Sequence, residues 1–245
     1  GLATLPQVLA CALIAIVLPT AISAVANSTW SYQMAGAAAV RLCEILDTPS
    51  IPESKTSKKP DGVVVEVNDV SYSYGDTQAL RGVSLVLNPG TTTALIGPSG
   101  SGKSTLATLI ARFDDPESGS IRLGGVDLRD ISSRDLYNMV SFVLQDPMLI
   151  NASIGRNISL AKPEASLEEI REAARTAQID DFIMSLPKGY DSVLGTDCSL
   201  SGGESQRVSI ARALLADTPI LIMDEATAFA EPDSELEIQK ALSAL

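Results

Sequence analysis

The chain has 245 residues, and its 30 Asp and Glu against 18 Lys and Arg give a formal net charge of −12 at pH 7. This acidic balance disfavours nonspecific binding to nucleic acid through bulk charge. The sequence has no His, and its three cysteines (Cys11, Cys43 and Cys198) are widely spaced, so it supports neither a His-based metal site nor a disulfide framework.

The first predicted element is an apolar helix near the start of the chain. Residues 8–26 carry no charge, and Arg41 is the first charged residue. This length suits a helix that spans a bilayer, in which neighbouring helices can satisfy the carbonyl that Pro19 frees. A cleaved signal peptide and a buried helix of a soluble protein are the alternatives. No basic segment precedes the apolar run, and the run is longer than a small core normally hides, so the spanning helix is favoured.

The polar stretch that follows is predicted to be a linker. Residues 47–62 are rich in Pro, Ser and Lys, a composition that cannot bury enough surface to order itself. A folded domain begins near Val63, and its roughly 180 residues suffice for one core. Residues 1–46 hold one Arg and one Glu, so all of the net negative charge belongs to the linker and this domain.

A phosphate loop is the most specific motif of the chain. The pattern G-x-x-x-x-G-K-[ST] is matched by Gly97, Pro98, Ser99, Gly100, Ser101, Gly102, Lys103, Ser104 and Thr105. We expect a buried strand over residues 93–96 before the loop and a helix over residues 104–112 after it. In that context the loop N–H groups and the helix N-terminus bind a phosphate. Lys103 reaches the β- and γ-phosphates, and Ser104 offers its hydroxyl to Mg²⁺.

A second anion site is predicted at the start of a later helix. Ser201, Gly202 and Gly203 precede a helical pattern that runs to Leu215. A helix start of this composition leaves backbone N–H groups free to bind an anion. The alternative is an ordinary N-cap with Glu204 in the first turn.

An apolar strand over residues 219–223 ends in two carboxylates, Asp224 and Glu225. Buried parallel strands are continuous apolar runs, and ligands bind at their C-terminal ends. Asp224 therefore fits a carboxylate on the Mg²⁺ side, and Glu225 fits the base that orients or deprotonates an attacking water.

The order of these motifs resembles the ATP-binding cassette (ABC) family, whose signature motif is similar to residues 200–207, with Glu204 where many members have Gln. The resemblance implies an α/β P-loop NTPase fold, with a mixed sheet, helices and an α-helical subdomain, that binds ATP and Mg²⁺. It also implies that Ser201, Gly202 and Gly203 serve the ATP on a partner's phosphate loop, so that two nucleotides lie between two subunits of a homo- or heterodimer.

Three further positions match the family. Tyr74 lies where an aromatic ring stacks on adenine, although Tyr72 is a rival for that role and either ring could simply pack on the sheet. Gln145 matches the glutamine that touches Mg²⁺ and the attacking water, and that links the domain to membrane helices. Glu231 replaces the Asp of a loop that makes a contact between the two domains.

The resemblance also covers the N-terminal part. Residues 41–49 follow the pattern by which exporter-type ABC subunits leave the membrane. It implies that residues 1–46 contain the last transmembrane helix, that residues 47–62 are a linker, and that residues 63–245 form a cassette in the cytoplasm of a multi-pass protein of the cell membrane. The family carries a histidine downstream of Glu225, whereas this chain reaches Leu245 without one. We therefore expect a fragment of a longer half-transporter.

The substrate class has one cue in the sequence. Residues 224–232 are similar to a variant found in exporter-fold pairs that handle iron siderophores of the yersiniabactin and mycobactin types. A multidrug or lipid exporter of the same fold is the alternative within the family. A soluble ABC ATPase of translation or DNA repair is the alternative from another class, and it does not fit the uncharged first 40 residues.

Overall fold

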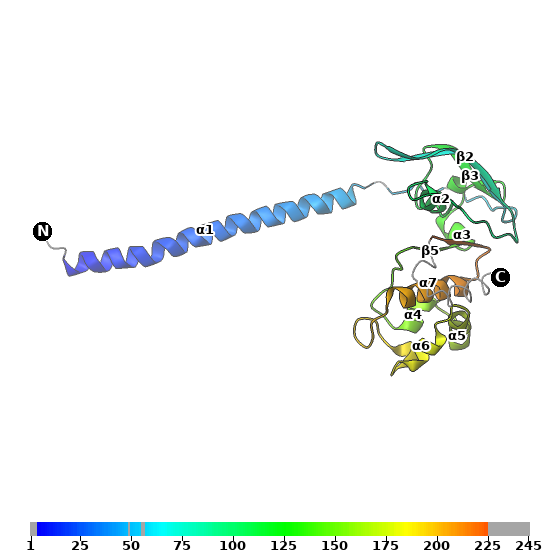
Figure 1. Cartoon of the computed structure of the whole chain (residues 1–245). Coiled ribbons are helices and arrows are strands. Elements are labelled where there is room, and N and C mark those ends of the chain that lie inside the picture. The colour runs from blue at the N-terminus through cyan, green and yellow to red at the C-terminus, as the bar shows by residue number, and fades with distance from the viewer. Residues whose placement is uncertain (1–3, 49, 55–56, 225–245) are drawn as a thin grey trace. The chain divides into compact units, whose positions relative to one another are not determined.

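The computed structural model describes residues 4–48, 50–54 and 57–224, and the chain divides into two compact units, residues 1–50 and 51–245 (Figure 1).

The first unit is one long helix, α1 (Leu5–Leu46). A helix of 42 residues is about 63 Å long, twice the thickness of a bilayer's hydrocarbon core. It is the one helix among the described residues that is long and apolar enough to cross a membrane. Its large apolar side chains, from Leu5 to Leu46, are all exposed. The hydroxyls of Thr20, Ser28, Thr29 and Ser31 bond to carbonyls of the same helix, so they need no water.

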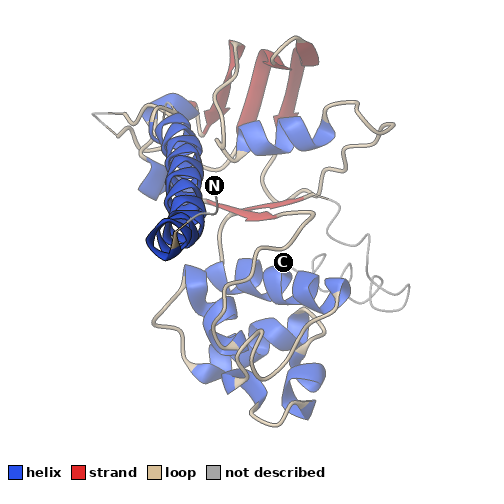
Figure 2. Ribbon diagram, turned by 90° about the vertical axis from the view of Figure 1, so that its left-hand side faces the viewer, coloured by secondary structure: helices blue, strands red, loops and turns tan. Residues whose placement is uncertain are grey.

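The second unit contains two sheets (Figure 2). The larger is antiparallel, with strand order β2-β1-β3-β4, and the smaller is a parallel pair, β5-β6. The strands are β1 (Val65–Tyr74), β2 (Thr77–Leu87), β3 (Ser118–Leu123), β4 (Val126–Asp127), β5 (Val140–Val143) and β6 (Ile220–Met223).

Some helices of this unit pack on the sheets and others pack mainly on one another. They are α2 (Lys103–Ile110), α3 (Ser133–Tyr137), α4 (Ile154–Ile158), α5 (Leu167–Thr176), α6 (Asp180–Ser185) and α7 (Gly202–Ala216), with 3-10 turns η1 (Leu128–Asp130), η2 (Ser159–Ala161) and η3 (Gly189–Asp191). The mixed strand directions and the separate group of helices confirm the predicted α/β fold with an α-helical subdomain.

A break in the register of β1 determines which of its side chains face the core. Val65 and Val67 are buried, as alternation along a strand requires, but the next buried residue is Val70. The pairing with β2 shifts between Val67 and Val70, where Asp69 has a φ of 49°. Such a bulge changes the face on which the following residues lie. It therefore places Tyr72 in the core, close to the end of β1.

Two hydrophobic cores lie within this unit. The first joins the antiparallel sheet to α2 through residues such as Val70, Leu106 and Ile121. The second joins α4, α5, α6 and α7 through residues such as Ile154 and Ile210. The phosphate loop and the 201–203 helix start therefore belong to different cores.

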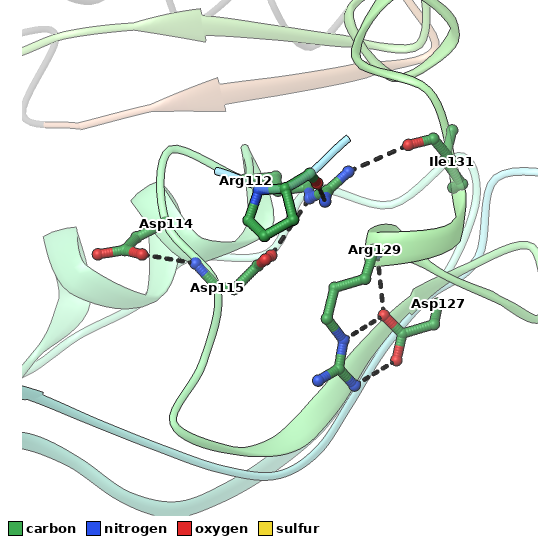
Figure 3. A network of polar contacts seen from close by, with 7 residues as sticks. Arg112, Asp114, Asp115, Asp127, Arg129 and Ile131 are labelled. Atoms are coloured by element: carbon green, nitrogen blue, oxygen red, sulfur yellow. Dashed lines mark hydrogen bonds and ion pairs between the residues drawn. The ribbon is translucent and has the colours of Figure 1, made fainter. Parts of the chain in front are cut away.

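The predicted linker has no helix or strand, but part of it is bound to the second unit. Arg112 follows α2 and is 4% exposed, and its guanidinium donates to the carbonyl oxygens of Pro52 (2.8 Å) and Ile131 (3.0 Å) and to Asp115 (3.2 Å). Figure 3 shows the contacts with Ile131 and Asp115. Lys58 adds an ion pair with Asp130 at 2.7 Å. Composition therefore failed to predict this ordering, because it does not reveal a buried cation elsewhere in the chain that donates a hydrogen bond to a carbonyl oxygen of the linker.

Candidate functional site

The phosphate loop leads directly into α2, as the motif predicts. Gly102, the residue before the helix, has a φ of +88°, and a Cβ there would lie 2.7 Å from the carbonyl oxygen of Ala79. Only glycine fits this position. The first turn of α2 leaves N–H groups without partners inside the helix, and they add to the partial positive charge at its N-terminus. The turn begins at Lys103, so these donors lie at the end of the loop that is predicted to bind a phosphate.

The prediction of a strand before the phosphate loop is wrong. Residues 91–98 form neither helix nor strand, and the Ile96 side chain is 94% exposed. An apolar run predicts burial but does not supply the neighbour that a strand needs for its hydrogen bonds. In the described ranges, β5 and β6 pair with each other and not with this segment. A cavity of about 500 Å³ remains, lined by Val63, Leu87, Leu95 and Ile222, with Lys103 and Asp224 also on its wall.

Lys103 folds back onto its own loop. Its ammonium group donates to the carbonyl oxygens of Gly97 and Pro98, both at 3.0 Å. The carbonyls that hold it belong to exposed residues, so water can replace the lysine there. The cation is therefore held beside the loop without being buried in the core.

Ser104 and Asp224 meet, although 120 residues separate them in the sequence. The Ser104 hydroxyl donates to Asp224 Oδ1 at 2.9 Å. The β5-β6 pair positions the carboxylate: Val143 pairs with Met223, and the Asp224 N–H donates to the Val143 carbonyl oxygen at 3.0 Å. Gln145 is exposed two residues after the end of β5. Asp224 and Gln145 thus follow the C-terminal ends of neighbouring parallel strands, where ligands bind in such sheets.

These residues can hold a divalent cation only together with a ligand. Within residues 4–224, apart from the three undescribed positions, no cluster of three or more His, Cys, Asp or Glu side chains could hold a metal ion. A hydroxyl and a carboxylate are hard oxygen ligands of the kind that Mg²⁺ prefers, and Mg²⁺ commonly completes its coordination with phosphate oxygens and water. The donor set at Ser104 and Asp224 therefore fits Mg²⁺ bound with a phosphate ligand.

The two tyrosines at the end of β1 differ in exposure. Tyr72 is 8% exposed and its hydroxyl donates to the Asp114 carboxylate, whereas Tyr74 is 56% exposed. The hydrogen bond to Asp114, together with burial, raises the pKa of Tyr72 to about 12. Tyr74 is thus the ring that is accessible to a ligand. The sequence did not indicate a role for Asp114, because an acidic pair after a helix is typical of a solvated turn.

Ser201 caps α7. Its hydroxyl accepts from the Glu204 N–H at 3.3 Å, and the Glu204 carboxylate accepts from the Ser201 N–H at 2.7 Å. This is a reciprocal capping box, so the ordinary N-cap role is present. The capping leaves other first-turn N–H groups at Gly202 and Gly203 with no partner inside the helix. Capping and anion binding are therefore compatible here.

Glu225 and residues 228–231 lie outside the described residues.

Comparison with known proteins gives a consistent result. The family model described as ABC transporter matches residues 80–228. The mycobactin import ATP-binding/permease protein IrtA of Mycolicibacterium smegmatis is 54% identical over 210 residues, which are 85% of this chain and 24% of that protein. The ATP-dependent lipid A-core flippase of Desulfotalea psychrophila is 46% identical over 223 residues, which are 89% of this chain and 39% of that protein.

A solved structure agrees with these matches. The ATP-bound structure of a bacterial Atm1-family ABC exporter aligns with a TM-score of 0.77 and 37% identity, over 84% of this chain and 37% of that one. The chain thus spans between 24% and 39% of the length of these three relatives.

Proposed function

The chain belongs to the ABC transporter family, and we propose that it binds ATP at the phosphate loop and couples ATP hydrolysis to transport across a membrane. The contact between Ser104 and Asp224 carries the proposal, because it joins the phosphate loop to the carboxylate that follows β6. In this proposal Lys103 leaves the carbonyls of Gly97 and Pro98 to contact the β- and γ-phosphates, and Tyr74 stacks on the base.

The chain's own oxygen ligands would hold Mg²⁺ beside the phosphates. The ion, when bound, neutralises charge on the phosphate oxygens. Ser104 and Asp224 would contact it, and Gln145 would lie beside it and the attacking water. Glu225, the next residue after Asp224, would accept a proton from that water. The chemistry needs little more than this positioning, because phosphoryl transfer depends on orientation and on charge stabilisation.

Asp224→Asn tests the ion site. We expect ATP to bind in the presence of EDTA with unchanged or slightly higher affinity, since a negative charge beside the phosphates is gone. The gain in ATP affinity on adding Mg²⁺ should shrink at least about tenfold, the scale of loss seen even for outer-sphere partners of metal ligands. Isothermal titration of the full-length protein in detergent, with and without Mg²⁺, measures both values.

Asp127→Asn is the control for this change. It alters a carboxylate that pairs with Arg129 at 2.7 Å, away from the loop, and should leave both affinities as they are. An undiminished effect of Mg²⁺ in Asp224→Asn would remove Asp224 from the site.

A second ABC subunit, in a homo- or heterodimer, would complete each ATP site. Ser201, Gly202 and Gly203 start a helix that packs in a different core from α2. We propose that these residues contact the ATP held by the partner subunit, and that ATP binding closes the dimer while hydrolysis opens it.

The exposed apolar surface of α1 supports a place in the cell membrane beside further helices, with the cassette in the cytoplasm. Residues 1–46 would then be the last membrane helix, 47–62 the linker and 63–245 the cassette.

An iron siderophore is the substrate class that we propose. The likeness of residues 224–232 to siderophore-handling pairs and the 54% identity with the IrtA protein support it. The proposal predicts that cells lacking the gene take up radioactive iron bound to a mycobactin-type siderophore several-fold more slowly. The intact gene should restore uptake and Lys103→Ala should not. Normal uptake together with lost drug efflux or lipid transfer would favour the exporter alternative, and recovery of the protein without detergent would favour a soluble ATPase.

A further inference from the structure

Two neighbouring aromatic rings, those of Tyr72 and Tyr74, lie at the C-terminal end of β1. The two rings lie side by side, with their centroids 5.0 Å apart and their planes at 82°. A perpendicular pair uses at most one face of either ring. Tyr74 therefore keeps at least one face that Tyr72 does not cover, and the side chain is 56% exposed.

Tyr72, unlike Tyr74, is fixed at both ends of its side chain. Its ring belongs to the core that includes Val70, Leu80 and Leu106. Its hydroxyl donates to one oxygen of Asp114, and the other oxygen of Asp114 accepts from the Asp115 N–H at 2.8 Å. The carboxylate that receives the hydroxyl is thus itself held in place, as Figure 3 shows for Asp114 and Asp115.

The segment that holds Tyr72 follows the helix of the phosphate loop. Residues 111–117 come directly after α2, and two more contacts tie them to the end of β1. The Glu117 N–H donates to the Ser71 carbonyl oxygen, and the Ser73 hydroxyl donates to the Glu117 carboxylate, both at 3.1 Å. The same helix that presents the phosphate loop therefore also leads into the support for the two rings.

We propose that the Tyr72–Asp114 pair is a positioning pair, which holds the Tyr74 ring at the angle that stacks on the base of the bound nucleotide. This inference rests on the proposed function, with ATP on the phosphate loop and its base on Tyr74. Neither Tyr72 nor Asp114 touches the nucleotide. Tyr72 acts through the edge-to-face contact with Tyr74, which is favourable for aromatic pairs at this separation.

The test compares ATP with inorganic tripolyphosphate, which has the phosphates but no base. Dissociation constants are measured for the full-length protein in detergent. Tyr74→Ala should weaken ATP binding roughly tenfold, the scale of a lost base–aromatic stack. Tyr72→Leu, which removes the supporting ring, should weaken ATP binding about fivefold, within the same range. Tyr72→Phe and Asp114→Ala, which remove only the hydrogen bond, should each weaken it about two- to threefold. Tripolyphosphate should bind all four variants as it binds the unaltered protein.

A double-mutant cycle separates positioning from general stability. In a Tyr74→Ala background, Tyr72→Phe should have no further effect on ATP binding, since the ring that it positions is gone. Tyr137→Phe is the control, because that tyrosine is 49% exposed on another element, and it should change neither affinity.

Three outcomes overturn the inference. Equal weakening of ATP and tripolyphosphate by the Tyr72 and Asp114 variants would mean that the pair only stabilises the domain. An undiminished effect of Tyr72→Phe without Tyr74 would mean the same. ATP binding that Tyr74→Ala leaves intact would remove the base from this ring. Failure of the unaltered protein to bind ATP or tripolyphosphate would instead contradict the proposed function itself.

Discussion

Lys103→Ala should raise the dissociation constant for ATP by two orders of magnitude or more. Lys103 is the cation of the phosphate loop, and a hydrogen bond to a charged partner is worth about 1.5–3 kcal/mol. Loss of two such bonds, to the β- and γ-phosphates, corresponds to at least about a hundredfold in affinity. Titration of the full-length protein with ATP, or with a fluorescent analogue displaced by ATP, measures the change.

The same substitution should leave the fold intact. In the structure the Lys103 ammonium group donates hydrogen bonds to two carbonyl oxygens, those of the exposed residues Gly97 and Pro98. Water can satisfy both once the amine is gone, so the melting temperature without nucleotide should not change. Lys162→Ala is the matched control, because it removes a surface pair with Glu169 at 2.7 Å. Such pairs contribute about 0–1 kcal/mol. Unchanged ATP affinity in Lys103→Ala would show that the loop is not the nucleotide site.

The sequence predicted the motif positions well because each motif has a local cause. Gly102 permits a backbone conformation that other residues avoid, and α2 begins one residue later. Ser201 and Glu204 form a capping box over one helical turn, and α7 starts there. The apolar run that ends at Met223 forms β6, with Asp224 directly after it. In each case the residues that determine the structure are neighbours in the sequence.

The features that the sequence did not predict depend on distant partners. Residues 93–96 have the composition of a strand but no pairing neighbour in the described part of the chain. The resemblance favours Tyr74 over Tyr72, but the burial of Tyr72 depends on the register break in β1 and on Asp114, 42 residues beyond Tyr72. The order in the linker depends on Arg112, 60 residues beyond Pro52. A pattern in one segment carries no information about such partners.

Glu225→Gln should separate binding of ATP from its hydrolysis. Glutamine has the shape and the hydrogen-bonding capacity of glutamate, but it cannot take a proton from the attacking water at neutral pH. General base catalysis contributes about 10²- to 10⁴-fold, so the rate of ATP hydrolysis should fall by at least about a hundredfold. The dissociation constant for ATP should stay nearly the same, because Lys103 and the loop N–H groups make the binding contacts.

The variant should therefore accumulate in the ATP-bound, closed dimer. Labelled ATP should stay with the full-length Glu225→Gln protein through gel filtration, whereas the unaltered protein should release labelled ADP. Glu169→Gln is the control, since that glutamate pairs with Lys162 and caps α5 away from the phosphate loop. The Glu169→Gln protein should hydrolyse ATP at the normal rate.

The contrast with Asp224→Asn identifies the role of each carboxylate. Loss of the Mg²⁺ effect on binding belongs to Asp224, and loss of hydrolysis with binding intact belongs to Glu225. Continued turnover in Glu225→Gln would place the base on another residue, and Gln145, two residues after the neighbouring strand β5, would then need a role beyond orienting the water.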